Sequence, residues 1–280
     1  MQGGLRALSL AACTLALLLA GMPDGNPAGG SARADANSPE APSAPERRLT
    51  LPGIGDAHNR VIVSPLEAPW NALVRVQIPG VAVCTGFVIA RAQIVTSAHC
   101  LWGRGLEKFV PPTAIHVLGG YSQGQFSGKA MGLAYRMARN FMPTKVSGAD
   151  IAVIQLDAPV VEEGVPLRPS KAARTGQKVF LGGYNQDRSE VIEADQDCTL
   201  IGGVRDADGL PLLRHDCAGT RGTSGAPLLT READGSWTVL GVQVAASNGQ
   251  KGGLAVPITA IMLLAEPPAQ AAPDAGAAPR

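Results

Sequence analysis

Aromatic side chains are scarce in this 280-residue chain, since Phe, Trp and Tyr together make up 4% of it. The core must therefore be built mainly from Val, Ile, Leu and Ala. An excess of charge of one sign is also missing, because 24 basic and 23 acidic side chains leave a net charge of +1. That balance gives no indication of a nucleic-acid or an acidic-substrate partner.

Cysteines are few, and none of the five belongs to a C-x-x-C pair. We therefore expect no zinc site and no other bound metal. Cys13 lies in the N-terminal apolar run, which leaves an even number of cysteines for the rest of the chain. An even number in an exported chain indicates disulfides, and the order along the chain suggests Cys84–Cys100 and Cys198–Cys217. Each bond would stabilise the fold by roughly 3 kcal/mol in the chain-entropy model.

The N-terminus has the pattern of an export signal. Residues 7–20 are an apolar run that follows Arg6. This run is shorter than the roughly 20 residues of a membrane span and is typical of a signal peptide. We predict a signal peptide over 1–20, with cleavage after Ala20 or as late as Ala34. A lipoprotein box ending at Cys13 and an uncleaved anchor are the alternatives. We expect the membrane to be contacted only transiently, through this signal.

Two further segments lack the residues that build a core. Residues 21–48 contain no Val, Ile, Leu, Phe, Tyr or Trp, and such a segment cannot bury enough apolar surface to order itself. We interpret 21–55 as a disordered linker or pro-segment. Arg47-Arg48 is either a processing site or a plain basic pair. The Pro/Ala-rich residues 266–280 are interpreted as a disordered tail.

The remaining residues, 56–265, predict one all-β domain. Their apolar runs are short, rich in β-branched residues and separated by Gly, Pro, Asn and Asp, which is typical of a barrel or sandwich. Residues 129–141 fit a helix or a strand, and Pro257–Glu266 predicts a closing helix. The runs are Ala72–Ile78, Val81–Ala90, Ile94–Thr96, Ile115–Leu118, Ile151–Leu156, Val179–Gly182, Trp237–Ala245 and Leu254–Ile258.

Three short segments contain candidate catalytic residues. His99 follows a β-branched strand, and histidine is the natural general base for a hydroxyl nucleophile. Asp150 opens an apolar strand, where a half-buried carboxylate needs a partner such as a histidine N–H. Ser224 is flanked by small residues, so the N–H groups of Gly222 and Ser224 can converge to form an oxyanion hole. Taken singly, each has a plain alternative: a structural histidine, a capping aspartate and an ordinary turn.

Taken together, the segments resemble the signatures of the chymotrypsin/trypsin clan of serine proteases. They read T-S-A-H-C at 96–100, A-D-I-A-V-I at 149–154 and G-T-S-G-A-P at 222–227, in the order of that clan and at similar spacings. The resemblance implies two six-stranded antiparallel β-barrels with a His99, Asp150 and Ser224 triad between them. It also implies an exported, monomeric serine endopeptidase that acts on polypeptides through an acyl-enzyme and uses no cofactor.

Departures from the animal digestive enzymes narrow this resemblance. Thr223 replaces the aspartate that pairs with the freed N-terminus in those enzymes, so that activation switch should be absent. The chain looks closer to the bacterial V8-like glutamyl endopeptidases, which implies a periplasmic or secreted bacterial protein. Two rival functions remain: a non-catalytic binding protein on a protease scaffold, and an esterase with the same triad. The Ser224 segment reads G-T-S-G-A and is therefore not the G-x-S-x-G elbow of the α/β-hydrolases.

The same comparison predicts a substrate pocket without the familiar specificity residues. Ala218 stands where trypsin has its aspartate, so a preference for Lys or Arg is not supported. Gly219 and Gln243 stand where the V8-like enzymes have the threonine and histidine that bind glutamate. We expect Val244 and Ala246 to form the pocket wall and to pair with the substrate backbone. The small side chains predict an open and fairly apolar pocket.

Overall fold

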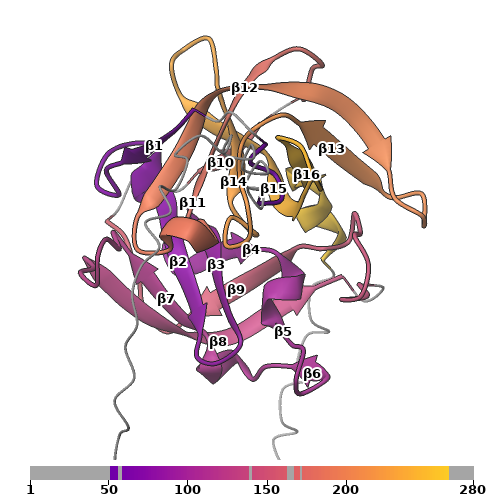
Figure 1. Ribbon diagram of the computed structural model, residues 1–280. Coiled ribbons are helices and arrows are strands. Elements are labelled where there is room, and N and C mark those ends of the chain that lie inside the picture. Colours follow the sequence, from indigo (N-terminus) through magenta and orange to yellow (C-terminus); the bar gives the residue numbers. More distant parts are fainter. Residues whose placement is uncertain (1–50, 56–58, 139–140, 163–166, 171, 265–280) are drawn as a thin grey trace, which may run out of the picture. The chain divides into compact units, whose positions relative to one another are not determined.

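The computed structural model describes residues 51–55, 59–138, 141–162, 167–170 and 172–264. Within these ranges the regular structure consists of β-strands and short 3-10 helices, and there is no α-helix. Its strands form two closed, six-stranded antiparallel barrels, which Figure 1 shows one above the other. This is the fold class that the sequence predicts.

The first barrel has the strand order β2-β3-β4-β9-β8-β7, and β2 closes it by pairing with β7. Its interior is built from β-branched residues such as Val74, Ile94 and Ile154, all fully buried. Few rings are needed because these side chains fill a pleated surface well. The strands are Leu73–Ile78 (β2), Ala82–Ala90 (β3), Gln93–Thr96 (β4), His116–Gly119 (β7), Gly128–Met137 (β8) and Ala152–Leu156 (β9).

The second barrel has the order β12-β11-β14-β15-β16-β13 and closes where β12 pairs with β13. Two short strands extend it, since β1 pairs with β12 and β10 runs parallel to β15. The strands are Arg60–Val63 (β1), Arg168–Pro169 (β10), Lys178–Gly183 (β11), Ile192–Arg205 (β12), Pro211–His215 (β13), Pro227–Arg231 (β14), Trp237–Ala246 (β15) and Gly253–Pro257 (β16).

Short elements complete the fold. Residues 129–141, open between helix and strand in the sequence, contain β8 up to Met137. The predicted closing helix is a 3-10 helix, η5, with Pro257 at its N-cap. Trp102–Gly103 (β5) and Lys108–Phe109 (β6) form a separate hairpin. The 3-10 helices are Trp70–Ala72 (η1), Ala98–Leu101 (η2), Pro112–Ala114 (η3), Gln186–Arg188 (η4) and Ile258–Leu263 (η5).

The N-terminal boundary of the folded domain needs correction. Residues 51–55, assigned to the linker from the sequence, lie against the second barrel: Ile54 is buried and Gly53 forms a bridge with Lys251. The sequence conceals this because the contacts are mainly backbone hydrogen bonds. The predicted signal peptide, most of the linker and the tail lie outside the described residues. Among the residues that are described, no helix is long and apolar enough to cross a membrane.

Candidate active site

His99 and Asp150 form a close pair at one end of the first barrel. Asp150 immediately precedes Ile151 and β9, and His99 lies in η2 directly after β4. Because β4 pairs with β9 in the register Thr96↔Ala152, both side chains emerge at the same barrel end. One oxygen of Asp150 accepts the backbone N–H of His99 at 2.8 Å, and the other lies 2.6 Å from Nδ1.

This pairing determines the tautomer of the histidine. The Asp150 carboxylate is 3% exposed and only accepts hydrogen bonds, so Nδ1 of His99 must donate. Nε2 then has a free lone pair on the side of the ring that faces away from Asp150. A histidine oriented in this way can accept a proton from a nearby hydroxyl group.

Ser224 lies in the loop between β13 and β14, which two left-handed glycines bend sharply. Gly222 has φ of +92° and Gly225 of +85°, a region that other residues rarely adopt. A Cβ at Gly225 would lie 2.2 Å from the Thr85 carbonyl oxygen. Ser224 and His99 line one cavity of about 670 Å³. The loop therefore brings the predicted nucleophile to the surface that His99 faces.

The peptide between Arg221 and Gly222 is oriented by a hydrogen bond from another loop. The carbonyl oxygen of Arg221 accepts the N–H of Gln186 at 2.7 Å. In a trans peptide the N–H points away from the C=O, so the Gly222 N–H points away from Gln186. Neither this amide nor that of Ser224 donates to another described residue. Both predicted oxyanion-hole donors are thus unoccupied by protein acceptors.

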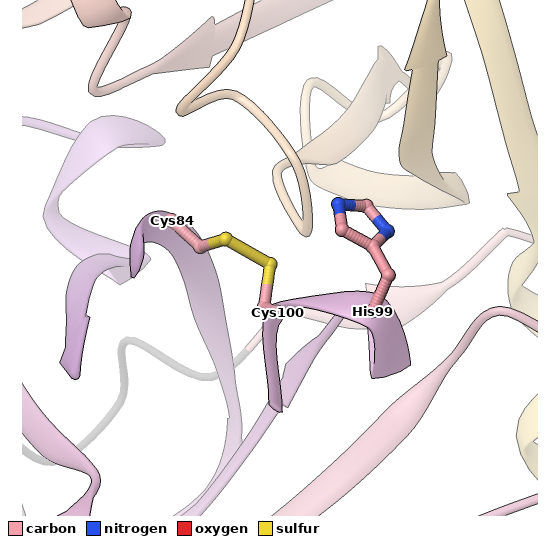
Figure 2. A group of neighbouring side chains, drawn as sticks. All are labelled: Cys84, His99 and Cys100. Atoms are coloured by element: carbon pink, nitrogen blue, oxygen red, sulfur yellow. A yellow bond between two sulfur atoms is a disulfide. The ribbon is translucent and has the colours of Figure 1, made fainter. Parts of the chain in front are cut away.

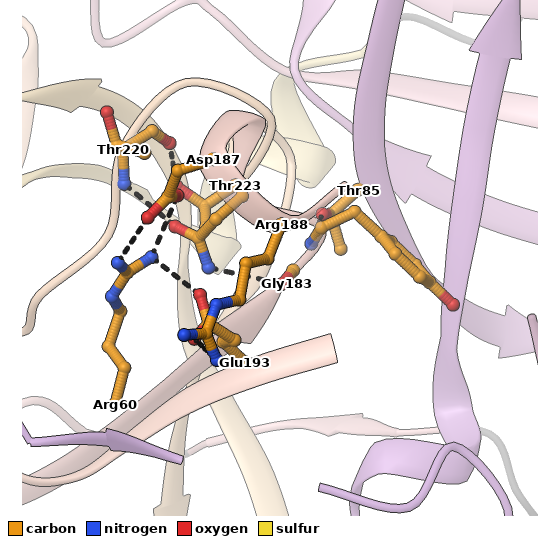
Figure 3. A network of polar contacts seen from close by, with 10 residues as sticks. Arg60, Thr85, Gly183, Asp187, Arg188, Glu193, Thr220 and Thr223 are labelled. Atoms are coloured by element: carbon orange, nitrogen blue, oxygen red, sulfur yellow. Dashed lines mark hydrogen bonds and ion pairs between the residues drawn. The ribbon is translucent and has the colours of Figure 1, made fainter. Parts of the chain in front are cut away.

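Thr85 holds this loop from the first barrel, and the sequence analysis missed it. Its hydroxyl donates to the Gly222 carbonyl at 2.8 Å and accepts the N–H of Tyr184 at 3.0 Å, while its own N–H donates to Ser224 O at 2.9 Å. Thr85 is fully buried, and Figure 3 shows it beside Gly183 and Thr223. The one sequence signal was its position next to Cys84.

Neutral hydrogen bonds stabilise the Ser224 loop at Thr223, the position where the animal enzymes have an aspartate. Thr223, 1% exposed, donates from Oγ1 to the Thr220 carbonyl at 2.5 Å. The N–H of Thr220 in turn donates to the side-chain oxygen of Asn185 at 3.0 Å. Asn185 also donates to Gly183 O at 3.3 Å. This network is local and contains no carboxylate.

A charged network anchors the neighbouring helix η4. Arg60 on β1 lies 2.6 Å from Asp187 and 2.9 Å from the buried Glu193, which also pairs with Arg188 at 3.3 Å (Figure 3). The hydrogen bonds from Arg60 lower the pKa of Asp187. These contacts fix η4. Its first residue is Gln186, whose N–H orients the Arg221–Gly222 peptide.

The predicted pocket residue Gln243 has internal partners in the structure. It is 2% exposed, and its Nε2 donates to Ala245 O at 3.0 Å. His215 accepts the Cys217 N–H on Nδ1, so its Nε2 carries the proton and donates to Gln243 Oε1 at 2.6 Å. Burial lowers the pKa of His215 to about 4. Both ends of the Gln243 amide are therefore engaged within the protein.

The predicted pocket residue Ala218 is held by an ion pair that the sequence did not reveal. Ala218 is 1% exposed, and its N–H donates at 2.8 Å to Asp195, which is fully buried. The same carboxylate oxygen lies 2.8 Å from Lys251 Nζ. A buried carboxylate is tolerable only with such partners. Val244 is buried and Ala246 half-buried at the end of β15.

Gly53 fastens three segments of this predicted pocket together. Its N–H donates to Ser247 O at 2.7 Å, and its carbonyl accepts from Gly252 at 3.1 Å and Gly219 at 3.3 Å. Its φ is +79°, and a Cβ there would lie 2.1 Å from Gly219 O and 2.9 Å from the Ala246 side chain. Only glycine fits this contact. The role of Gly53 could not be predicted from the sequence, because it depends on backbone groups and not on an ionisable side chain.

Both expected disulfides are present. Cys84 joins Cys100 with an S–S distance of 2.05 Å, and Cys198 joins Cys217. Cys84, His99 and Cys100 lie close enough together to resemble a metal site, as Figure 2 shows. The two sulfurs are bonded to each other, however, so they offer no thiolate for a metal. This bond instead fixes η2, and with it His99, to strand β3.

Comparisons with known proteins agree with this architecture. The chain is 27% identical over 205 residues to "Transmembrane protease serine 7" of Homo sapiens and of Mus musculus, covering 63% of this chain but only 23% and 24% of those proteins. Serine protease 56 of Homo sapiens is 34% identical over 67 residues, which is 23% of this chain and 11% of that protein. The chain thus spans about a quarter of the length of the first of these relatives.

A solved structure, "Structure of Glu endopeptidase in complex with MPD", superposes with a TM-score of 0.62 at 20% identity, over 75% of this chain and 96% of that one. At that identity the match supports the fold alone. The family model described as "Trypsin-like peptidase domain" matches residues 84–242, more than half of the chain. This range begins at Cys84 and contains His99, Asp150 and Ser224. The chain therefore belongs to the trypsin-like peptidase family.

Proposed function

We propose that this protein is an exported serine endopeptidase with His99, Asp150 and Ser224 as its catalytic triad. The observation that supports this most directly is the double contact of Asp150 with the backbone N–H and Nδ1 of His99. That contact leaves Nε2 as the proton acceptor on a ring that lines the same cavity as Ser224. The membership of the peptidase family agrees with this assignment.

In the proposed reaction, Ser224 Oγ attacks the carbonyl carbon of the scissile peptide bond and its proton passes to His99 Nε2. The negative charge that develops on the carbonyl oxygen is held by the N–H groups of Gly222 and Ser224. His99 returns the proton to the departing amine, and the C–N bond breaks to leave an acyl-enzyme. A water molecule, deprotonated by His99, then attacks the acyl carbon. The bond from that carbon to Ser224 Oγ breaks, His99 returns the proton to Oγ, and the acid is released.

No step in this mechanism needs a cofactor or a metal, and the substrates are polypeptides. We propose that the protein acts as a monomer in the periplasm or outside a bacterial cell, after removal of a signal peptide within 1–34. The two disulfides support an oxidising compartment. Most of the linker and the tail are proposed to lie outside the catalytic domain.

The proposed enzyme is a V8-like relative with an altered preference before the cut. The substrate side chain before the cut would be apolar, because the residues proposed to surround it carry no charge: Ala218, Gly219, Val244 and Ala246. The Gln243 amide is already engaged by His215 and Ala245. We therefore propose that neither a basic residue nor glutamate is selected at this position.

A fluorophosphonate probe tests the triad directly, because it reacts only with an activated serine. The purified wild-type protein should be labelled on Ser224, as identified by mass spectrometry of its peptides. The Ser224→Ala variant should not be labelled, and the His99→Gln variant should react far more slowly. Absence of labelling in a folded wild-type protein would refute the proposal.

A peptide-library digestion separates the endopeptidase from its rivals. An endopeptidase cuts internal peptide bonds and an esterase turns over only short esters. A non-catalytic binding protein turns over neither, and its activity in the cell survives Ser224→Ala. The same digestion reports the residue preferred before the cut.

A further inference from the structure

Ser224 lines a cavity that is formed by residues outside the predicted substrate pocket. It has a volume of about 670 Å³ and is formed by the β2–β3 turn, the Cys84–Cys100 disulfide, the β5–β6 hairpin and the Arg221–Gly222 segment. None of the five predicted pocket residues lines it. Its full lining is Pro79, Gly80, Val81, Ala82, Val83, Cys84, His99, Cys100, Trp102, Gly103, Arg104, Gly105, Leu106, Arg221, Gly222 and Ser224.

Two arginines give this cavity a positive charge. Arg104 lies in the β5–β6 hairpin and Arg221 directly precedes Gly222, and both side chains are exposed. Neither forms a hydrogen bond or ion pair through its guanidinium with any residue in the described ranges. The lining contains no acidic residue, and Glu107 of the same hairpin is not part of it. The overall charge of +1 conceals this local excess.

The position of Ser224 decides which part of a substrate enters the cavity. A peptide cut at Ser224 extends from it in two directions. The residues before the cut are assigned to Ala218, Gly219 and the β15 segment that ends at Ala246. The residues after the cut must then leave on the other side, past the disulfide and the two arginines.

We propose that this cavity binds the leaving-group side of the substrate and selects aspartate or glutamate at the first two positions after the cut. This inference rests on the proposed endopeptidase function. Guanidinium groups present several N–H donors in a plane that matches a carboxylate. Trp102 is half-buried beside them, and Leu106 is 57% exposed, so the cavity also offers apolar surface for the stems of the acidic side chains.

Two peptides that differ only after the cut test the selection. They share the residues before it and continue with Glu-Asp or Gln-Asn. At low salt kcat/KM should be roughly three- to tenfold higher for the acidic peptide, and the ratio should fall as salt is added. In the double variant Arg104→Gln with Arg221→Gln the ratio should approach one. The double lysine variant should keep part of it.

Arg174→Gln is the matched control, since Arg174 is exposed on the second barrel and does not line the cavity. This variant should keep the wild-type ratio. A wild-type ratio near one at low salt would overturn the proposal, as would a ratio that persists after both cavity arginines are removed.

A binding measurement distinguishes this proposal from the endopeptidase assignment. Fluorescent peptides that begin with Glu-Asp or Gln-Asn are titrated into the Ser224→Ala variant, and fluorescence anisotropy reports their affinities. The acidic peptide should bind more tightly, and the two arginine substitutions should remove the difference. Fluorophosphonate labelling with equal affinities overturns only the acidic preference. Absence of labelling with an arginine-dependent preference overturns only the proteolytic function.

Discussion

The hydroxyl of Thr85 donates a 2.8 Å hydrogen bond to the carbonyl oxygen of Gly222, joining a strand of the first barrel to the loop of the second that contains Ser224. The same threonine binds Ser224 O through its backbone N–H. One buried residue therefore holds the carbonyl groups of both residues whose N–H groups are the proposed oxyanion donors.

We predict that Thr85→Val lowers kcat by about ten- to a hundredfold while changing KM little. Valine keeps the shape but leaves Gly222 O and Tyr184 N without their buried partner, so the oxyanion donors lose their orientation. Steady-state kinetics on active-site-titrated enzyme would measure the change. Thr85→Ser should restore most of kcat, because it restores the hydroxyl. A serine variant as slow as the valine variant would contradict this role.

We predict that Asp150→Asn lowers kcat by about 10³- to 10⁴-fold. An asparagine presents an N–H₂ to Nδ1 of His99, which favours the tautomer whose Nε2 is already protonated. The fold should change little, because the remaining amide oxygen can still accept the His99 N–H. Kinetics together with near-UV circular dichroism would separate the two effects. A loss of kcat below tenfold would argue against Asp150 as the triad acid.

We predict that Gly53→Ala lowers kcat/KM for peptides by at least tenfold, because its Cβ would force Gly219 and Ala246 apart. Gly176→Ala is the matched control. Gly176 has φ of +82°, close to that of Gly53, but a Cβ there meets nothing within 4 Å. Backbone strain should cost each variant about 1 kcal/mol of stability, and Gly53→Ala should lose more because its Cβ also overlaps the Gly219 carbonyl. Equal kinetics in the two variants would show that the Gly53 contact does not shape the pocket.

We predict that His215 makes the fold less stable at acidic pH. Its pKa of about 4 in the folded state lies below the value of about 6.5 of an unfolded histidine, so the unfolded chain binds more protons between these values. Stability from this group is complete above pH 6.5 and is lost as pH falls to about 4, by up to about 3 kcal/mol. Urea unfolding of the wild type and of His215→Gln at several pH values would measure it.

The His215→Gln variant keeps a polar group but does not titrate. The difference in free energy of unfolding between it and the wild type should therefore change by about this amount across the window. A difference that stays constant with pH would mean that His215 is not the titrating group.

Several strands could be predicted from their residues alone. β2, β3, β4, β9 and β15 are rich in Val and Ile, which favour a pleated surface, and each was expected within two residues of its bounds. β12 was missed, because Glu193, Asp195 and Asp197 interrupt its apolar pattern. Two of these acids are buried and need basic partners. Arg188 is close to Glu193 in the sequence, but Arg60 and Lys251 lie far from the acids that they pair with.

The sequence by itself determined the family resemblance, the fold class and the candidate triad, because these reside in short contiguous segments whose order and spacing are visible. The tertiary structure alone decided how Thr85 holds the Gly222 carbonyl, how Gly53 joins the segments at Gly219 and Ser247, and how Arg104 and Arg221 come to line one cavity. Each of these depends on backbone groups or charges brought together from distant strands. Such contacts form only when the barrels close and bury these groups, so a local sequence pattern cannot predict them.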